Sequence, residues 1–197
     1  MEKRLHKRAQ KRPQKRPLEE QLNIEISEFI SNRHSLQLAS VSSDGEPFAS
    51  YAPFAADEDS FWVVLSDIAV HGKNFLGDDR GSVLIIEDES TADELFARRR
   101  VSYQVRADAP DVDSESWNRG VALLEARHGR MPRMLSELDD FRVFRLSPTS
   151  GRYVKGFGAA YSLSAGTLGR AQVEHLLDGH RSRQASPANE TGEHEIA

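Results

Sequence analysis

The sequence predicts an α+β fold in which a mainly antiparallel sheet closes into a barrel or sandwich, with helices at its periphery. Six or seven short apolar runs have the length of strands and are separated by turn residues. Few segments with helical periodicity lie between them, and short antiparallel strands joined by tight turns favour closure. A Rossmann fold is excluded, because Gly156-Phe157-Gly158 is a short turn motif rather than a strand-Gly-x-Gly-x-x-Gly-helix unit.

The strands are expected where apolar residues form compact or alternating runs. The first two form a hairpin around the turn at Ser43–Pro47, and a turn at Ser150-Gly151 is expected to separate the last two. The predicted strands are Leu36–Val41, Phe48–Phe54, Phe61–Leu65, Ser82–Ile86, Arg99–Val105, Phe141–Leu146 and one that opens at Tyr153. The side chains expected in the core are Leu36, Leu38, Val63, Leu84, Ile86, Val143 and Phe144.

Helices are expected where apolar residues recur every three or four positions. Leu18–Arg33 has such a face, and Ser116–His128 has another. Thr91–Glu94 has the spacing of a capping box and predicts a short helix ending near Ala97. A last helix is predicted over Leu168–Leu177.

Composition describes one globular domain of 197 residues, with 38% hydrophobic and 29% charged side chains. The absence of cysteine excludes disulfides, cysteine-bound zinc, iron–sulfur clusters and thiolate ligation of haem. No apolar stretch approaches the roughly 20 residues that cross a bilayer. We therefore expect a cytoplasmic protein with no membrane partner.

The charge is distributed unevenly. The first 17 residues hold eight Lys and Arg side chains against the single Glu2, so the rest of the chain is more acidic than the net charge of −5 suggests. A basic tail can bind nucleic acid or anionic lipid, but an acidic body is a poor nucleic-acid platform. We expect a disordered basic leader over 1–17, a single domain over 18–180, a disordered polar tail over 181–197, and no nucleic-acid partner.

Common catalytic motifs are absent: there is no Gly-x-Ser-x-Gly, no Walker loop and no His-Glu-x-x-His. The seven histidines are scattered. His175 and His180 are five residues apart, which does not place them on one face of a helix. Taken singly, each histidine is more often a solvated side chain than a metal ligand.

Several segments together carry a resemblance to a known family. They are Leu36–Val41, Ser50–Phe54, Ile85–Asp88, Leu95–Arg98 with Arg100, Leu135-Ser136 with Leu138, Asp140-Phe141, Phe144–Leu146, Val154–Gly158 and Asp178–His180. Over about Glu19 to His180, the chain resembles the HugZ/HutZ haem-utilisation family, a branch of the pyridoxamine-phosphate-oxidase-like superfamily.

The resemblance implies a split β-barrel of the FMN-binding type, assembled as a homodimer with haem bound at the subunit interface. It implies that His180 is the axial iron ligand and that Asp140 hydrogen-bonds to it, since a carboxylate fixes the tautomer of a ligating imidazole. Arg100 matches the family position that faces the haem. Without the resemblance, Asp140 reads as a cap or surface charge, and His180 as a tail residue.

Two further candidates lie near these positions. Arg98 would share a strand face with Arg100 and could pair with a haem propionate, although a solvated basic strand edge explains both arginines equally well. His71 opens His71-Gly-Lys-Asn74, where FMN-binding relatives carry Lys-x-x-Asn to hold the flavin phosphate. An imidazole is a weaker phosphate partner than an ammonium, so FMN is the less favoured cofactor.

Three functions remain open at this stage. The first is oxidative opening of haem with release of iron, supplied with electrons by an unidentified donor. The second is haem storage or delivery without turnover, and the third is an FMN-dependent oxidoreductase. The sequence indicates no catalytic residue beyond the haem ligands.

Overall fold

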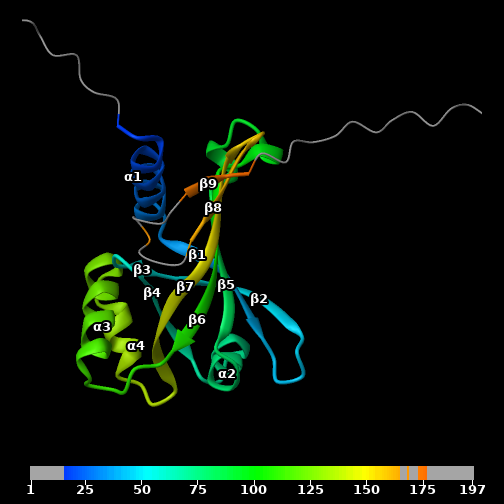
Figure 1. Cartoon of the computed structure of the whole chain (residues 1–197). Coiled ribbons are helices and arrows are strands. Elements are labelled where there is room, and N and C mark those ends of the chain that lie inside the picture. Colours follow the sequence, from blue (N-terminus) through cyan, green and yellow to red (C-terminus); the bar gives the residue numbers. More distant parts are fainter. Residues whose placement is uncertain (1–15, 165–167, 169–172, 177–197) are drawn as a thin grey trace, which may run out of the picture.

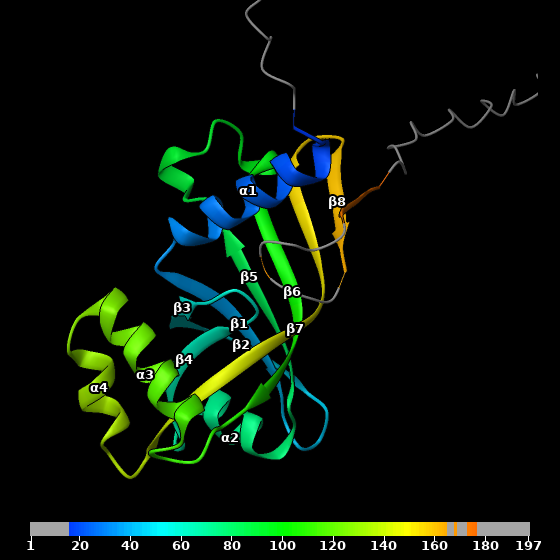
Figure 2. The same cartoon turned by 60° about the vertical axis from the view of Figure 1, so that its left-hand side comes forward.

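The sheet dominates the computed structural model, which describes residues 16–164, 168 and 173–176 (Figure 1). Among these residues nine strands pair in the order β2-β1-β5-β6-β7-β4-β3, with β8 added to β7 and β9 added to β8, and every pairing is antiparallel. The sheet curls into a half-barrel with few helices, as predicted (Figure 2). The strands are β1 (Ser35–Val41), β2 (Pro47–Pro53), β3 (Ala55–Ala56), β4 (Phe61–Ser66), β5 (Arg80–Ile86), β6 (Arg100–Asp108), β7 (Phe141–Gly156), β8 (Ala159–Leu163) and β9 (Val173–His175).

Strand β7 is continuous, so the predicted turn at Ser150-Gly151 is wrong. A β-bulge lies just after Pro148: Val105 of β6 pairs with Pro148 and Gln104 pairs with Ser150, so one extra residue of β7 is accommodated without a turn. Gly151 is needed because a Cβ there would lie 2.6 Å from Cδ1 of Tyr103. Strand β7 therefore runs along most of the molecule, pairing with β4 at its start and with β6 and β8 further on.

The core has two parts: the larger fills the inside of the curled sheet, and a smaller one, which includes Val143, packs between the sheet and the helix Glu115–His128. Five of the seven predicted core residues are buried: Leu36, Leu38, Val63, Val143 and Phe144. Leu84 and Ile86 are only half-buried, and their neighbours Val83 and Ile85 fill the core instead. The run from Val83 to Ile86 is apolar at every position, so no alternation marks which face points inward.

The two long predicted helices are confirmed. Helix α1 (Leu18–Ser31) buries Leu22, Ile26, Phe29 and Ile30 as expected. Helix α3 (Glu115–His128) is capped by Ser114, whose hydroxyl accepts a hydrogen bond from the Trp117 amide at 3.2 Å. Two short helices were not predicted, α2 (Val70–Gly77) and α4 (Met131–Ser136).

Of the other two predicted helices, the first ends at Ala97 as expected but is 3-10 rather than α-helical, and the second is wrong. Near Thr91 the chain forms two 3-10 turns, η1 (Glu89–Thr91) and η2 (Leu95–Ala97), capped by Asp88 and Glu94. Each cap satisfies one amide and the chain extends after each turn, so the capping-box pattern does not grow into an α-helix. The described part of Leu168–Leu177 contains β9 rather than a helix.

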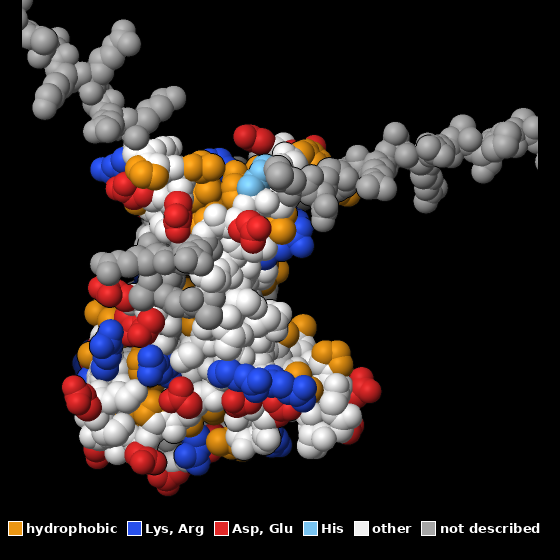
Figure 3. Space-filling view, in the orientation of Figure 1, with side chains coloured by type: hydrophobic (Ala, Val, Ile, Leu, Met, Phe, Trp, Pro, Cys, Tyr) orange, Lys and Arg blue, Asp and Glu red, His pale blue; other side chains and the backbone are white. Residues whose placement is uncertain are grey.

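The elements divide between two ends of the molecule (Figures 1 and 2). The α1 end holds α1, the loop with η1 and η2, and strands β8 and β9. The α2 end holds α2, α3, α4 and the start of β7. On the face seen in Figure 3, charged side chains of both signs gather at the α2 end, and the hollowed flank between the two ends carries few of them.

The predicted terminal segments fall almost wholly outside the described residues. The polar tail over 181–197 lies outside the described residues, as does the basic leader except for Arg16 and Pro17. No helix within the described residues is long and apolar enough to cross a bilayer.

Candidate functional site

Asp140 lies at the α2 end, in the turn that leads into β7. Its carbonyl accepts the Asp67 amide at 2.7 Å, and its Oδ2 accepts the Ser66 hydroxyl at 3.3 Å. The side chain is half-buried and forms no ion pair within the described residues. Its position is therefore fixed by the backbone and by Ser66, while its charge stays available to a hydrogen-bond donor.

His71 lies at the same end, in the first turn of α2. Its Nδ1 is 3.0 Å from the hydroxyl of Ser50 on β2. Burial lowers the pKa of this imidazole below its ordinary value, so the ring is neutral at neutral pH. It is a poor partner for a phosphate under those conditions.

A close backbone contact joins these two residues into one region. A Cβ at Gly72 would lie 2.1 Å from the Ser66 carbonyl oxygen, so glycine allows α2 to pack directly on the end of β4. Ser66 in turn binds Asp140. Sequence reasoning did not identify Ser66, and it noted Ser50 only within a motif.

In His71–Asn74, the segment that holds the flavin phosphate in FMN-binding relatives, side chains form hydrogen bonds within the protein instead. Asn74 is buried and donates its side-chain amide to the Ser40 hydroxyl at 2.9 Å. His71 is held by Ser50, and Lys73 is exposed. These residues do not form the Lys-x-x-Asn phosphate site of FMN-binding relatives.

The three consecutive arginines lie at the α1 end and have different environments. Arg98 precedes β6, so strand alternation does not extend to it; its Nε donates to the Glu87 carbonyl at 2.8 Å and its Nη1 to Glu89 at 3.1 Å. Arg99 stacks on the Phe29 ring at 4.7 Å. Arg100 donates to the Arg98 carbonyl at 2.9 Å and forms no ion pair within the described residues. Arg100 is therefore the arginine of the three that is free to pair with an anion.

The candidate residues do not meet within one chain. Arg100 pairs with Val154, whereas Asp140 directly precedes Phe141, at the other end of β7. At about 3.3 Å per residue, roughly 40 Å of strand separates them. That path is much longer than a porphyrin.

His180 lies outside the described residues. The nearest described strand is β9, in which His175 pairs with Tyr161 at the α1 end. Within the described residues no group of three or more His, Cys, Asp or Glu side chains could hold a metal ion.

Comparisons with known proteins identify the family. The model of the pyridoxamine 5'-phosphate oxidase family matches residues 22–155. The haem oxygenase HutZ of Vibrio cholerae is 42% identical over 161 residues, covering 82% of this chain and 90% of its own.

Solved structures agree with this match. The crystal structure of Vibrio cholerae HutZ, described as a haem storage protein, has a TM-score of 0.61 and 41% identity, covering 64% of this chain and 88% of that one. Campylobacter jejuni ChuZ has a TM-score of 0.71 and 27% identity, covering 83% of this chain and 66% of that one. The chain therefore belongs to the pyridoxamine 5'-phosphate oxidase family of split-barrel proteins and, within it, to the HugZ/HutZ haem-utilisation branch.

Proposed function

We propose that this protein binds haem as part of haem utilisation and degrades it oxidatively, releasing iron. The observation that carries the proposal is the 42% identity, over 82% of the chain, to a relative named a haem oxygenase. The free charges of Asp140 and Arg100 support it, because a haem pocket needs a group that orients the iron ligand and a cation for the propionates.

The separation of these residues supports a pocket built by two subunits. A haem that contacts both Asp140 and Arg100 needs Asp140 from one chain and Arg100 from another. A two-fold dimer that places the α1 end of one subunit against the α2 end of its partner would form two such pockets.

The place of His180 in the sequence, five residues after the end of β9, fits the same arrangement. Five residues of chain separate it from His175, and five residues span at most about 18 Å. His180 is therefore tethered within about 18 Å of His175, at the Arg100 end of its own subunit, whereas about 40 Å of β7 leads from that end to Asp140. The proposed hydrogen bond runs from the His180 imidazole to Asp140 of the partner subunit.

Each residue then has one role. The His180 imidazole binds the iron, and the Asp140 carboxylate accepts the N–H of its other ring nitrogen, which fixes the tautomer and increases its basicity. Ser66 holds that carboxylate in place. Arg100 pairs with a propionate and so orients the haem. Bound haem, with dioxygen and electrons from a donor not yet identified, supplies the oxidation chemistry itself.

Storage or delivery without turnover is the second candidate function. The observation that favours it is the description of the HutZ crystal structure as a haem storage protein. The FMN alternative is disfavoured by the neutral imidazole of His71 and the internal hydrogen bond of Asn74.

The test is a spectrum followed by a turnover assay on the full-length protein. Added haem should give a Soret band, whereas a flavin spectrum of the purified protein would support the FMN alternative instead. Ascorbate and dioxygen should then remove the Soret band and release iron that a ferrous chelator detects. Catalase must be present, because peroxide formed from ascorbate and dioxygen bleaches haem without an enzyme.

The outcomes separate the candidates. Loss of the band with stoichiometric iron in the wild-type protein, but not in His180→Ala, supports degradation. A Soret band that persists with every reductant tried contradicts degradation and favours storage.

A further inference from the structure

Three rings form a row across neighbouring strands at the α1 end of the sheet. Tyr153 of β7 pairs directly with Tyr161 of β8, and Tyr161 pairs with His175 of β9. The rings of Tyr153 and Tyr161 stack with their centroids 6.3 Å apart, and those of Tyr161 and His175 are 5.0 Å apart. His175 is exposed whereas Tyr153 is fully buried, so the row connects the surface to the core.

The buried end of the row has a proton acceptor. The Tyr153 hydroxyl donates to Oε1 of Glu25 at 2.7 Å, from α1, which crosses this end of the sheet (Figure 2). Lys155 at 2.6 Å and Arg99 at 4.0 Å pair with the same carboxylate. Burial opposes ionisation of Glu25, but the hydrogen bonds from Lys155 and Tyr153 prevail and lower its pKa. Burial and the adjacent carboxylate raise the pKa of Tyr153, so at neutral pH a neutral phenol faces a carboxylate.

The other buried tyrosine has no such acceptor. Tyr103 is 3% exposed, and its hydroxyl has no hydrogen-bond partner within the part of the chain that the structure describes. Loss of one electron makes a phenol proton strongly acidic, and a base within hydrogen-bond reach is needed to take it. Cross-strand packing explains the stacked rings, but it does not require a carboxylate on the phenol. Of the two buried tyrosines, Tyr153 is therefore the one equipped to lose an electron and a proton together.

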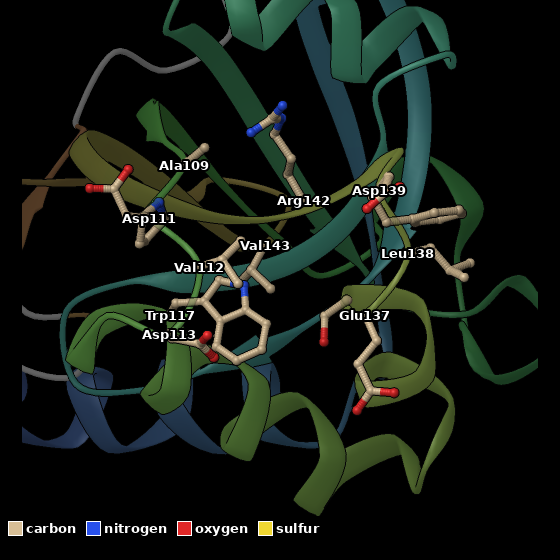
Figure 4. A pocket seen from close by; sticks show the side chains of 13 residues that line it. Ala109, Asp111, Val112, Asp113, Trp117, Glu137, Leu138, Asp139, Arg142 and Val143 are labelled. Carbon is tan, nitrogen blue, oxygen red and sulfur yellow. The ribbon is translucent and has the colours of Figure 1, made fainter.

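The tryptophans lie away from the row. Both pack in the smaller core cluster beside α3, and Trp62 donates its indole N–H to Asp57 at 3.0 Å. Trp117 lines an acidic cavity of about 500 Å³ at the α2 end, between the β6–α3 and α4–β7 connections (Figure 4). The carboxylates that line this acidic cavity are Asp111, Asp113, Glu137 and Asp139. Electron transfer along the row therefore involves neither tryptophan.

The row lies beside both groups proposed to contact haem at the α1 end. Val101, the neighbour of Arg100 on β6, pairs directly with Tyr153. His180, the proposed iron ligand, follows His175 by five residues. Haem bound as proposed would therefore lie near the exposed end of the row.

We propose that Tyr153 donates one electron, through Tyr161 and His175, to haem that hydrogen peroxide has oxidised; this inference rests on the proposed function. Peroxide takes two electrons from the bound haem and, with two protons, becomes two molecules of water. Tyr153 replaces one of these electrons, and its phenol proton passes along the hydrogen bond to Glu25. The products are a neutral tyrosyl radical, a protonated Glu25 and a haem that lacks one electron, which ascorbate supplies. The donated electron spares the porphyrin from unspecific oxidation.

Rapid-freeze electron paramagnetic resonance of the full-length protein, loaded with ferric haem and mixed with hydrogen peroxide, tests the proposal. The chain has four tyrosines, so the radical can be assigned by single substitutions. The wild-type protein should give a tyrosyl signal that Tyr153→Phe loses. Glu25→Gln should also lose it, because an amide accepts the hydrogen bond but does not take the proton. Lys155→Gln breaks the same ion pair, keeps the base and should retain the signal.

The remaining tyrosines are matched controls. Tyr103→Phe, buried without a partner, and Tyr51→Phe, 67% exposed on β2, should leave the signal unchanged. A signal that persists in Tyr153→Phe, or that either control removes, would overturn the proposal. So would the absence of a tyrosyl radical in a protein whose Soret band responds to peroxide. A protein that shows no Soret band on loading would refute the proposed function itself, and electron donation to haem with it.

A haem-free measurement separates failure of the row from failure of haem binding. Because the chain has no cysteine, Glu174→Cys on β9 can carry a single ruthenium photo-oxidant beside His175. Flash oxidation of the label should produce the tyrosyl radical, detected by transient absorption, and adding Tyr153→Phe should abolish it. An oxidised label that yields no radical on Tyr153 would show that the row does not carry electrons, and would overturn the proposal even if haem binds.

Discussion

The half-buried imidazole of His71 makes the stability of the fold depend on pH. Burial lowers its pKa in the folded protein below the ordinary value of 6.5, so the unfolded chain binds the proton more readily. The free energy of unfolding should therefore fall as pH decreases from above 6.5 through the lowered pKa. His71→Gln keeps a polar partner for Ser50 and should lose this part of the slope.

Urea midpoints at about pH 7.5 and about pH 5 check this prediction. The wild-type protein should lose more stability between the two conditions than His71→Gln does. Equal losses would mean that the folded environment does not disfavour the charged ring.

The neighbouring arginines should separate ligand binding from stability. Arg100→Ala should weaken haem affinity by about 1.5–3 kcal/mol, as expected for one charge-assisted pair, with little change in unfolding. Arg98→Ala should instead destabilise the fold by about 1–3 kcal/mol, because its guanidinium anchors the loop through Glu87 and Glu89. Haem titration and urea unfolding of both variants check this. If Arg98→Ala weakened haem binding and Arg100→Ala destabilised the fold, the assignment of the two arginines would be wrong.

The sequence identified candidate site residues but not their surroundings. Asp140, Arg100 and His71 could be named because they lie in recognisable segments. The contact of Ser66 with Asp140 joins positions 74 residues apart, and that of His71 with Ser50 crosses from α2 to β2. Pairings of this kind depend on tertiary structure and leave no local pattern.

At the scale of elements, α3 packs on the sheet so closely that one glycine is required. A Cβ at Gly120 would lie 2.4 Å from Cε3 of Trp62 and 2.9 Å from Cγ1 of Val143. Helix propensity alone predicts that Gly120→Ala stabilises by about 1 kcal/mol. We expect destabilisation by about 1–3 kcal/mol instead, because the buried Trp62 ring must move.

Thermal or urea unfolding checks this, with Gly77→Ala as the control. That glycine ends α2 and an added Cβ would meet nothing within 4 Å, so the control should be neutral or slightly stabilising. A stabilised Gly120→Ala would contradict the close packing of α3.

Elements with clear periodicity were predictable, and the others were not. Helices α1 and α3 followed from their apolar faces. The inward face of β5 could not be assigned because Val83–Ile86 does not alternate. The continuity of β7 through Pro148 could not be predicted, because proline and glycine ordinarily indicate a turn. The bulge that accommodates them depends on pairing with β6, which the local sequence does not show.

The whole molecule is an elongated curled sheet with different chemistry at its two ends. Asp140, His71 and the acidic cavity lie at the α2 end, whereas Arg100 and β9 lie at the α1 end. We propose that a haem pocket forms where the α1 end of one subunit meets the α2 end of another. Sedimentation should therefore give a dimer, and a monomer that binds haem at full stoichiometry would argue against it.

The most direct test uses a purified heterodimer of one His180→Ala chain and one Asp140→Asn chain, each with its own affinity tag. If Asp140 acts on the partner's His180, one pocket holds both native residues and the other holds neither. The iron–imidazole stretching band of the ferrous haem complex, measured by resonance Raman, should then match the wild-type protein. If both residues served the pocket from the same chain, the single remaining His180 would face the asparagine introduced at position 140, and the band would match the Asp140→Asn homodimer. That result would contradict a pocket shared between subunits.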